Sequence, residues 1–287
     1  MTLEALVLPT DGLTLRGLRR ACPGAPRVLA LHGWLDNAAS FVPLLPHLPD
    51  LDLVLLDLPG HGRSDHLPPG VSYTGASAIA QVLAAADALG WERFCLLGHS
   101  MGAGIASLTA AAAPERIQAL LAIEGLGGLV GTDAQTVTRL RDALTAARAL
   151  AAKPLRVFPD LDLPVRARMR LNELSAGNAR LLVERGVVPT QGGYHWSSDP
   201  RLTLPTPIRL TEGQVRNLLS AVTCPAWVLF ATPAQSYFPE PQRAARAALL
   251  PHARVEYMAG THHLHMEQPA AVAALLTRFL SDHPIAV

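Results

Sequence analysis

Cysteine and lysine are both scarce in this sequence of 287 residues. It contains three cysteines, Cys22, Cys95 and Cys224, which are far apart, and no CxxC pair occurs. This pattern favours isolated core thiols in a reducing compartment over a disulfide framework. Lys153 is the only lysine, so arginine supplies nearly all of the positive charge.

Long apolar runs are also missing. No stretch reaches the roughly 20 apolar residues that a membrane-spanning helix needs. The N-terminus carries Glu4 where a signal peptide would carry positive charge, and it lacks a long apolar segment. We therefore expect no export and a cytoplasmic protein. The formal net charge is only +1, which argues against nucleic acid or a membrane surface as a partner.

Short apolar runs alternate with helical patterns along the first half of the chain. About half of the residues are apolar, 49%, and the length suits one large α/β domain with an insertion. Alternation of buried strands with helices predicts parallel βαβ units with both faces of the sheet covered. The predicted strands are 27–33, 52–60, 93–100 and 119–125, and the predicted helices are 76–90 and 103–117.

The pattern breaks between residues 126 and 221, where the segments are helix-like and rich in charge and proline. Strands are expected again at 225–233 and 253–260, followed by an amphipathic helix at 269–280. The sequence thus predicts an α/β core from 1–125 and 222–287, with 126–221 as a helical cap. The cap has 13 basic and 8 acidic residues, whereas the remainder has 11 basic and 15 acidic residues. The excess of positive charge in the cap could attract anionic substrates. It is also explained by solvated helix faces, which is the interpretation we favour.

The strongest motif is Gly98-His99-Ser100-Met101-Gly102, which fits the G-x-S-x-G nucleophile elbow. It follows a predicted strand and precedes a predicted helix, the context that this motif requires. Small glycines allow the sharp turn that exposes the serine hydroxyl, and the helix N-terminus favours developing negative charge. Ser100 is therefore the predicted nucleophile.

A second turn, His32-Gly33-Trp34, closes the predicted strand 27–33. A loop at this place can point a backbone N–H at the oxygen that becomes negative during acyl transfer. We expect the backbone N–H groups of Trp34 and Met101 to form this oxyanion hole. Taken alone, the His-Gly pair indicates no more than a tight turn.

These segments together resemble the α/β-hydrolase superfamily, and most closely its serine hydrolase-like branch. The resemblance covers nearly the whole chain except the middle of 126–221, where "GGYHWSSDPRL" and "LTEGQV" are also similar to the branch. It implies a mostly parallel sheet with a helical cap and a triad in the chain order serine, acid, histidine. The turn from Asp57 to Ser64 matches one that is mainly structural in the family, so Asp57 and His61 receive no catalytic role.

Three histidines crowd the sequence Gly260-Thr-His-His-Leu-His-Met-Glu267. The family pattern of Gly, one residue, His and then Glu five positions later selects His262 as the general base. His263 is the alternative if the loop is shifted by one residue, and His265 is expected to line or underlie the pocket. A zinc site at the three histidines is disfavoured, because ligands so close in one loop rarely face a single ion.

The acid of the triad is harder to assign, because the loop after strand 225–233 contains no aspartate, although the superfamily commonly places one there. Glu240 and Glu124 are the two candidates. Glu240 follows a proline and suits the start of a helix without any catalytic role. Glu124 ends a buried strand, where an ionised carboxylate is costly unless paired, and we favour it as the acid. The competing interpretation is a structural salt bridge from Glu124 to an arginine of the cap.

The sequence therefore predicts a serine hydrolase that cleaves small-molecule carboxylic esters with Ser100, His262 and Glu124, and that needs no cofactor or metal. Dehalogenases and epoxide hydrolases of the superfamily need a carboxylate nucleophile. Because position 100 is a serine, these activities are disfavoured. The same triad could cleave a carbon–carbon bond in a dione. A catalytically weak, ligand-binding member of the fold is the alternative from another class. Acyl chain length and oligomeric state are not given by the sequence.

Overall fold

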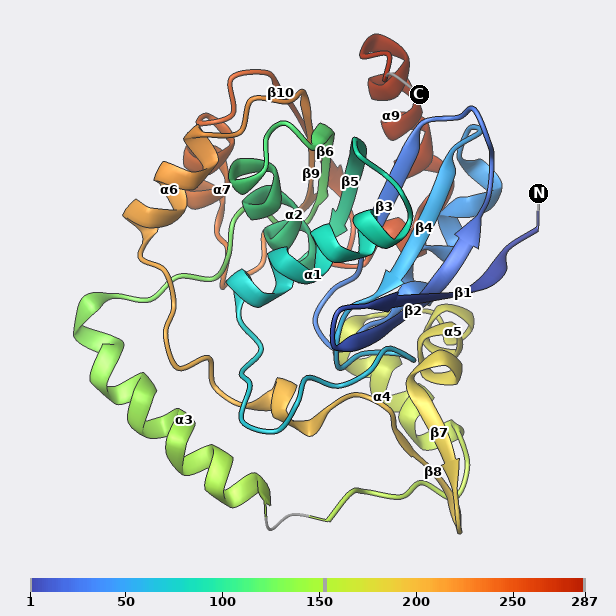
Figure 1. The fold of residues 1–287 in the computed structure, drawn as a ribbon, viewed down its shortest axis with the longest axis vertical. Helices are drawn as coiled ribbons and strands as arrows, with labels where there is room; N and C mark the ends of the chain where they lie inside the picture. Colours follow the sequence, from blue (N-terminus) through green and yellow to red (C-terminus); the bar gives the residue numbers. More distant parts are fainter. Residues whose placement is uncertain (1, 152–153, 286–287) are drawn as a thin grey trace.

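The computed structural model describes residues 2–151 and 154–285, and it has a large sheet with helices on both faces (Figure 1). The order of the strands in this sheet is β1-β2-β4-β3-β5-β6-β9-β10. Strands β1, β2 and β4 pair antiparallel, and the remaining neighbours pair parallel. The strands are β1 Glu4–Thr10, β2 Leu13–Arg20, β3 Arg27–Leu31, β4 Asp52–Asp57, β5 Phe94–His99, β6 Ile117–Ile123, β9 Ala226–Thr232 and β10 Ala253–Ala259.

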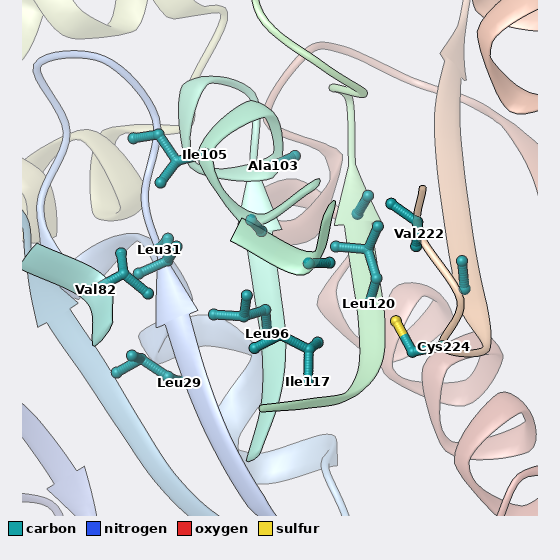
Figure 2. Close-up of a cluster of buried hydrophobic side chains, with 14 of the residues drawn as sticks. Leu29, Leu31, Val82, Leu96, Ala103, Ile105, Ile117, Leu120, Val222 and Cys224 are labelled. Atoms are coloured by element: carbon teal, nitrogen blue, oxygen red, sulfur yellow. The ribbon is translucent and has the colours of Figure 1, made fainter. Parts of the chain in front are cut away.

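Successive residues of each central strand enter different hydrophobic clusters, because side chains alternate between the faces of a sheet. In β3, Leu29 and Leu31 join one cluster, whereas Val28 and Ala30 join the other. Figure 2 shows Leu29, Leu31 and Leu96 of the strands in the same cluster as Val82 and Ala103 of two helices. The central strands are therefore buried on both sides, which explains why they consist of unbroken apolar runs.

Different helices cover the two faces. The first face is covered by α1 Gly75–Ala88, α2 Met101–Ala112, α6 Glu212–Ser220 and α7 Glu240–Ala247. The second face is covered by the 3-10 helix η1 Ala38–His47 and by α9 Pro269–Asp282. The predicted parallel sheet with helices on both faces is confirmed.

No strand of the large sheet comes from residues 126–221, as far as these are described. The elements there are η2 Asp133–Gln135, α3 Thr136–Ala151, α4 Asp162–Asn172, α5 Ala176–Gly186, β7 Val187–Thr190, β8 Gly193–Trp196, η3 Pro200–Thr203 and α6. Strands β7 and β8 form a separate antiparallel hairpin, which the sequence analysis did not anticipate. The hairpin is half exposed, so it lacks the apolar run that reveals a buried strand.

Residues of this middle segment, 126–221, contact the loop that follows β3 and the end of β4. The Asn37 side chain donates to the carbonyl of Leu182 at 2.8 Å, and Arg185 forms an ion pair with Asp57 at 2.8 Å. Helix α6 differs from the rest, because its Val215 joins the core cluster on the sheet. The predicted boundary at residue 222 therefore falls after a helix that packs on the sheet.

The sequence did not predict the N-terminal hairpin β1–β2, the 3-10 helix η1 or the short helix α8 Leu264–Glu267, whereas α7 begins at Glu240, which was considered as the start of a helix. Strand β2 extends the sheet beyond β4, and Arg243 of α7 donates to the carbonyl of Ala231 in β9 at 2.7 Å. Among the described residues, no helix has both the length and the apolar character to cross a membrane.

Candidate active site

Ser100 occupies a sharp turn between the end of β5 and the start of α2. Its backbone angles are φ 51° and ψ −113°, a region that residues other than glycine rarely adopt. The N–H of Ser100 donates to the carbonyl of Ile123 in β6 at 2.8 Å, which anchors the turn to the neighbouring strand. A strained strand-to-helix turn of this kind projects the serine side chain away from the sheet.

The two glycines that flank this turn are required by close contacts. A Cβ atom on Gly98 would lie 2.5 Å from the backbone nitrogen of Ala103, and one on Gly102 would lie 1.9 Å from the carbonyl oxygen of Leu31. Real Cβ atoms do not approach backbone so closely, so only glycine fits at either position. The missing side chain of Gly98 lets the end of β5 lie against α2, and that of Gly102 lets the N-terminus of α2 lie against the end of β3.

Glu124 and His262 meet although they are far apart in sequence. Glu124 directly follows β6 and has a positive φ of 55°. Its Oε2 lies 2.9 Å from Nδ1 of His262, which stands in the loop after β10. The Glu124 side chain is fully buried, whereas that of His262 is 20% exposed. A carboxylate on Nδ1 favours the tautomer whose Nε2 can accept a proton.

The buried carboxylate of Glu124 has other donors. The N–H of Ala231 donates to Oε1 at 2.6 Å, and Nη2 of the fully buried Arg243 lies 3.1 Å from the same oxygen. These partners offset the desolvation of an ionised carboxylate. The salt bridge anticipated as a competing explanation does exist, but the arginine belongs to α7 rather than to residues 126–221, and the His262 contact exists beside it.

The environment of His262 fixes its backbone and leaves one side of its ring accessible. His99 Nε2 lies 2.9 Å from the carbonyl oxygen of His262. The hydroxyl of Tyr237 lies 3.3 Å from His262 Nε2. Among the described residues, no hydrogen bond joins Ser100 directly to His262. Such catalytic hydrogen bonds are often long or unformed before substrate binds.

The two predicted oxyanion donors lie at neighbouring backbone turns. Trp34 follows β3, and Met101 is the first residue of α2. The contact of Gly102 with the end of β3 brings these turns together. His32 holds the first turn, because its Nδ1 lies 2.8 Å from the carbonyl of Gly33 and its Nε2 accepts from the N–H of Leu58 at 3.0 Å. Burial lowers the pKa of His32 to about 4, so its ring is neutral near pH 7.

Comparisons with known proteins agree with this architecture. Residues 26–172 match the family model described as alpha/beta hydrolase fold. A serine hydrolase-like protein of Danio rerio is 31% identical over 88% of this chain and 81% of its own length. The chain belongs to the α/β-hydrolase superfamily, in its serine hydrolase-like branch. The resemblance drawn from the sequence motifs is thereby confirmed.

Solved structures of other α/β hydrolases are similar over nearly the whole chain. A hypothetical protein from Pseudomonas aeruginosa PAO1 is 40% identical, with a TM-score of 0.91 and coverage of 98% of this chain and 99% of its own. A thioesterase domain from the curacin biosynthetic pathway is 25% identical, with a TM-score of 0.82 and coverage of 96% and 99%.

The other two histidines of the loop, His263 and His265, have partners of their own in this α/β hydrolase. His263 is 2% exposed, and its Nε2 lies 3.1 Å from Oδ2 of Asp36. His265 is fully buried, and its Nε2 lies 2.7 Å from the hydroxyl of Ser40. His263 thus has its own carboxylate, and His265 has a buried hydroxyl as its partner. Of the three histidines, only His262 contacts Glu124 within the described structure.

Glu240 and Asp57 also have other partners. Glu240 opens α7 and accepts a hydrogen bond from the Tyr257 hydroxyl at 2.8 Å, so this candidate acid does not contact His262. Asp57 accepts from the N–H of Ala38 at 2.8 Å and pairs with Arg185. Its contacts are those of a structural residue that ties β4 to the middle segment.

One group of side chains in the described structure has metal-ligating chemistry: Asp36, His99 and His263, whose donor atoms lie within 4.8 Å of one another. Asp36 is already neutralised, since Arg168 lies 3.0 Å from Oδ1 and His263 lies 3.1 Å from Oδ2. The zinc site considered for His262, His263 and His265 differs from this group. Asp36 and His99 replace two of those three histidines.

Two residues at the site were missed by the sequence analysis, Arg243 and Tyr237. Arg243 lies in the segment "EPQRAARA", whose composition suits an ordinary solvated helix. Tyr237 lies in the loop after β9, which the superfamily pattern marks only as the usual place of the acid. Neither residue belongs to a motif, and only the tertiary fold brings them to Glu124 and His262.

Proposed function

We propose that this α/β hydrolase is a serine hydrolase that cleaves carboxylic esters through an acyl-enzyme intermediate. The contact of 2.9 Å between Glu124 and His262 carries the proposal. It pairs a buried carboxylate with a partly exposed imidazole, close to a serine held in a strained elbow. This combination of nucleophile, base and orienting acid is what acyl transfer requires.

The reaction follows from these roles. Ser100 Oγ attacks the acyl carbon while His262 Nε2 takes its proton, and the N–H groups of Trp34 and Met101 stabilise the oxyanion. The carbon–oxygen bond to the leaving alkoxide then breaks, and His262 returns the proton to that oxygen. A water molecule attacks the acyl-enzyme with His262 as base again, which releases the carboxylic acid and restores Ser100. No step uses a cofactor or a metal ion.

The substrate is proposed to be a small ester bound beneath residues 126–221, which act as a cap over residues 1–125 and 222–287. Contacts of this segment with the loop after β3 and with the end of β4 support that role, since the end of β3 lies against the start of α2, which follows Ser100. The similarity to a thioesterase domain makes thioesters a natural extension, because both classes pass through the same acyl-enzyme.

Intact mass spectrometry after treatment with a fluorophosphonate tests the proposal. We expect one adduct on the wild type, none on Ser100→Ala, and an adduct on the matched control Ser220→Ala, which changes an exposed serine at the end of α6. Hydrolysis of p-nitrophenyl esters of increasing chain length would then define the size of the acyl pocket. A folded wild type that gains no adduct would favour a ligand-binding protein with vestigial catalysis.

A further inference from the structure

The turn that carries the proposed oxyanion donor Trp34 has a strained backbone. The N–H of Asp36 donates to the carbonyl of Gly33 at 3.1 Å, which closes a β-turn with Trp34 and Leu35 at its centre. Leu35 has a positive φ of 58°, at the position where a type II turn usually carries glycine. A leucine keeps this conformation only when its surroundings hold it there. The Trp34 turn, residues 33–36, therefore depends on its partners.

The middle segment, 126–221, supplies several of these partners. Four consecutive residues, 34–37, each form a polar contact with η3, α4 or α5 of that segment. The contacts are Trp34 Nε1 with the Leu202 carbonyl at 2.9 Å, the Leu35 carbonyl with Arg168, the Asp36 carboxylate with Arg168 at 3.0 Å, and Asn37 Nδ2 with the Leu182 carbonyl at 2.8 Å. The chain that follows β3 is thus held by the middle segment as well as by the core.

Arg168 holds the strained part of this turn with two nitrogens of its guanidinium. Nη2 donates to the carbonyl of Leu35, and Nη1 donates to Oδ1 of Asp36 at 3.0 Å. The guanidinium is itself held in place, because Nη1 also donates to the Asn172 side chain at 3.3 Å and the group lies over the ring of Trp196, 5.8 Å from its centre. A planar, rigid fork of donors can fix two acceptors at once.

Asp36 also connects the Trp34 turn to the loop of the proposed base. Its Oδ2 lies 3.1 Å from Nε2 of His263, the residue after His262, so Arg168 and His263 contact the two oxygens of one carboxylate. The N–H of Trp34 has no hydrogen-bond acceptor within the described part of the chain, which leaves it available to a ligand. Arg168 therefore contacts the turn that links a free N–H to the loop of the base.

We propose that Arg168 is a positioning residue that keeps the N–H of Trp34 directed at the oxyanion by holding the Leu35 carbonyl and the Asp36 carboxylate. The inference rests on the proposed function, in which this N–H stabilises the oxyanion. Arg168 acts through the turn rather than on the reacting atoms. The middle segment then does more than cover the substrate, because it supplies the group that completes the oxyanion hole.

Replacing Arg168 by lysine has a distinct kinetic effect under this proposal. The lysine keeps the positive charge beside Asp36, but its single ammonium group cannot hold the carboxylate and the Leu35 carbonyl in the same fixed geometry. A bond to the oxyanion is stronger in the transition state than in the ground state, so its misalignment lowers kcat and leaves KM nearly unchanged. We expect kcat to fall by about fivefold to thirtyfold, less than for loss of a whole donor, and KM to stay within about twofold.

Steady-state hydrolysis of p-nitrophenyl esters by Arg168→Lys tests this expectation. Arg185→Lys is the matched control, since Arg185 is another buried arginine of the middle segment that pairs with a core carboxylate, Asp57, at 2.8 Å. We expect the control to keep kcat within about twofold, because its ion pair lies outside the Trp34 turn. An unchanged kcat in Arg168→Lys, an equal fall in both variants, or a change confined to KM would overturn the inference.

A second measurement separates this inference from the proposed function. Hydrogen exchange at the N–H of Asp36, followed by mass spectrometry of overlapping peptides, reports opening of the turn that this N–H closes. We expect exchange to be faster by about threefold or more in Arg168→Lys than in the wild type, and unchanged in Arg185→Lys. Equal exchange in wild type and Arg168→Lys would overturn the role of Arg168. Faster exchange in a protein that never reacts with a fluorophosphonate would keep its role in the turn and reject the hydrolase proposal.

Discussion

Two consecutive histidines, His262 and His263, each pair with a carboxylate, but the first is partly exposed and the second is buried. His262 lies 2.9 Å from the carboxylate of Glu124, and His263 lies 3.1 Å from that of Asp36. Each carboxylate also pairs with an arginine, Arg243 in the first case and Arg168 in the second. The residues are adjacent in the chain, yet they point to different carboxylates on different sides of the loop.

The difference lies in the nitrogen that faces away from the carboxylate. The His262 side chain is 20% exposed, and its Nε2 lies 3.3 Å from the hydroxyl of the half-exposed Tyr237. The His263 side chain is 3% exposed, and its Nδ1 is buried without a hydrogen-bond partner in the described structure. A histidine–carboxylate pair can therefore act as a base only when its free nitrogen reaches a nucleophile, whereas the same pair in the interior is structural.

Replacing each histidine by glutamine should separate the two pairs most strongly. We expect His262→Gln to lower kcat/KM by roughly 10⁴-fold to 10⁶-fold, as for loss of a triad base. His263→Gln should keep activity within about tenfold and lower the free energy of unfolding by about 1–3 kcal/mol, because Asp36 loses a buried partner. Ester hydrolysis and urea unfolding measure the two effects. Equal losses of activity would mean that both histidines serve the reaction.

Replacing the two carboxylates tests the same comparison between the pairs, with a smaller expected effect on activity than replacing the histidines. Glu124→Gln should lower kcat by about 10⁴-fold, since His262 loses the group that fixes its tautomer. Asp36→Asn should leave kcat within about tenfold but destabilise the fold by about 3–5 kcal/mol, because Arg168 then lacks its buried counter-charge. Steady-state kinetics and chemical denaturation of both variants check this. An active Glu124→Gln protein would remove Glu124 from the triad.

The last expected effect concerns pH, and it changes stability rather than the proposed chemistry. Burial, followed by nearby histidines, lowers the pKa of His99 and His265 well below the usual value, and these residues flank His263. Below about pH 6.5 the unfolded chain binds protons that the folded chain does not, so stability falls as pH falls. For His32, with a pKa lowered to about 4, the loss between pH 7 and pH 5 is about 2 kcal/mol.

Urea unfolding at pH 7, 6 and 5 measures this loss. The pKa of Asp36 is lowered by His263 and Arg168 despite its burial, so its contribution to stability persists throughout that range and does not offset the histidines. A free energy of unfolding that stays constant from pH 7 to pH 5 would contradict the neutral, buried state of these histidines.

Much of the architecture could be predicted from sequence, because buried strands and the elbow leave local patterns. Ser100 follows from its glycines, and Glu124 was favoured because a carboxylate at the end of an apolar strand needs a partner. Arg243 could not be predicted, since it is separated from Glu124 by 119 residues and belongs to a helix of ordinary polar composition. Tyr237 reaches His262 only through the packing of two loops.

Local patterns also failed where strands are short or half exposed. The hairpin β7–β8 has only four residues in each strand, and none of the residues of β8 is fully buried. The alternation in β2 is regular over most of its length, but the strand contains Arg16, Arg19 and Arg20 in place of a strong apolar run. Such elements depend on partners in the fold rather than on a strong apolar run.

The position of Glu124 after β6 has a consequence for how the protein can change. In the arrangement common in the superfamily, the loop after the strand before last carries the acid, so altering that loop disarms the histidine. Here residues 233–239 carry no acid, and the orientation of His262 depends on a residue elsewhere. Apart from Tyr237, which contacts His262, and the buried Phe238, this loop can therefore vary while the proposed catalytic residues stay intact, which makes it a target for directed evolution.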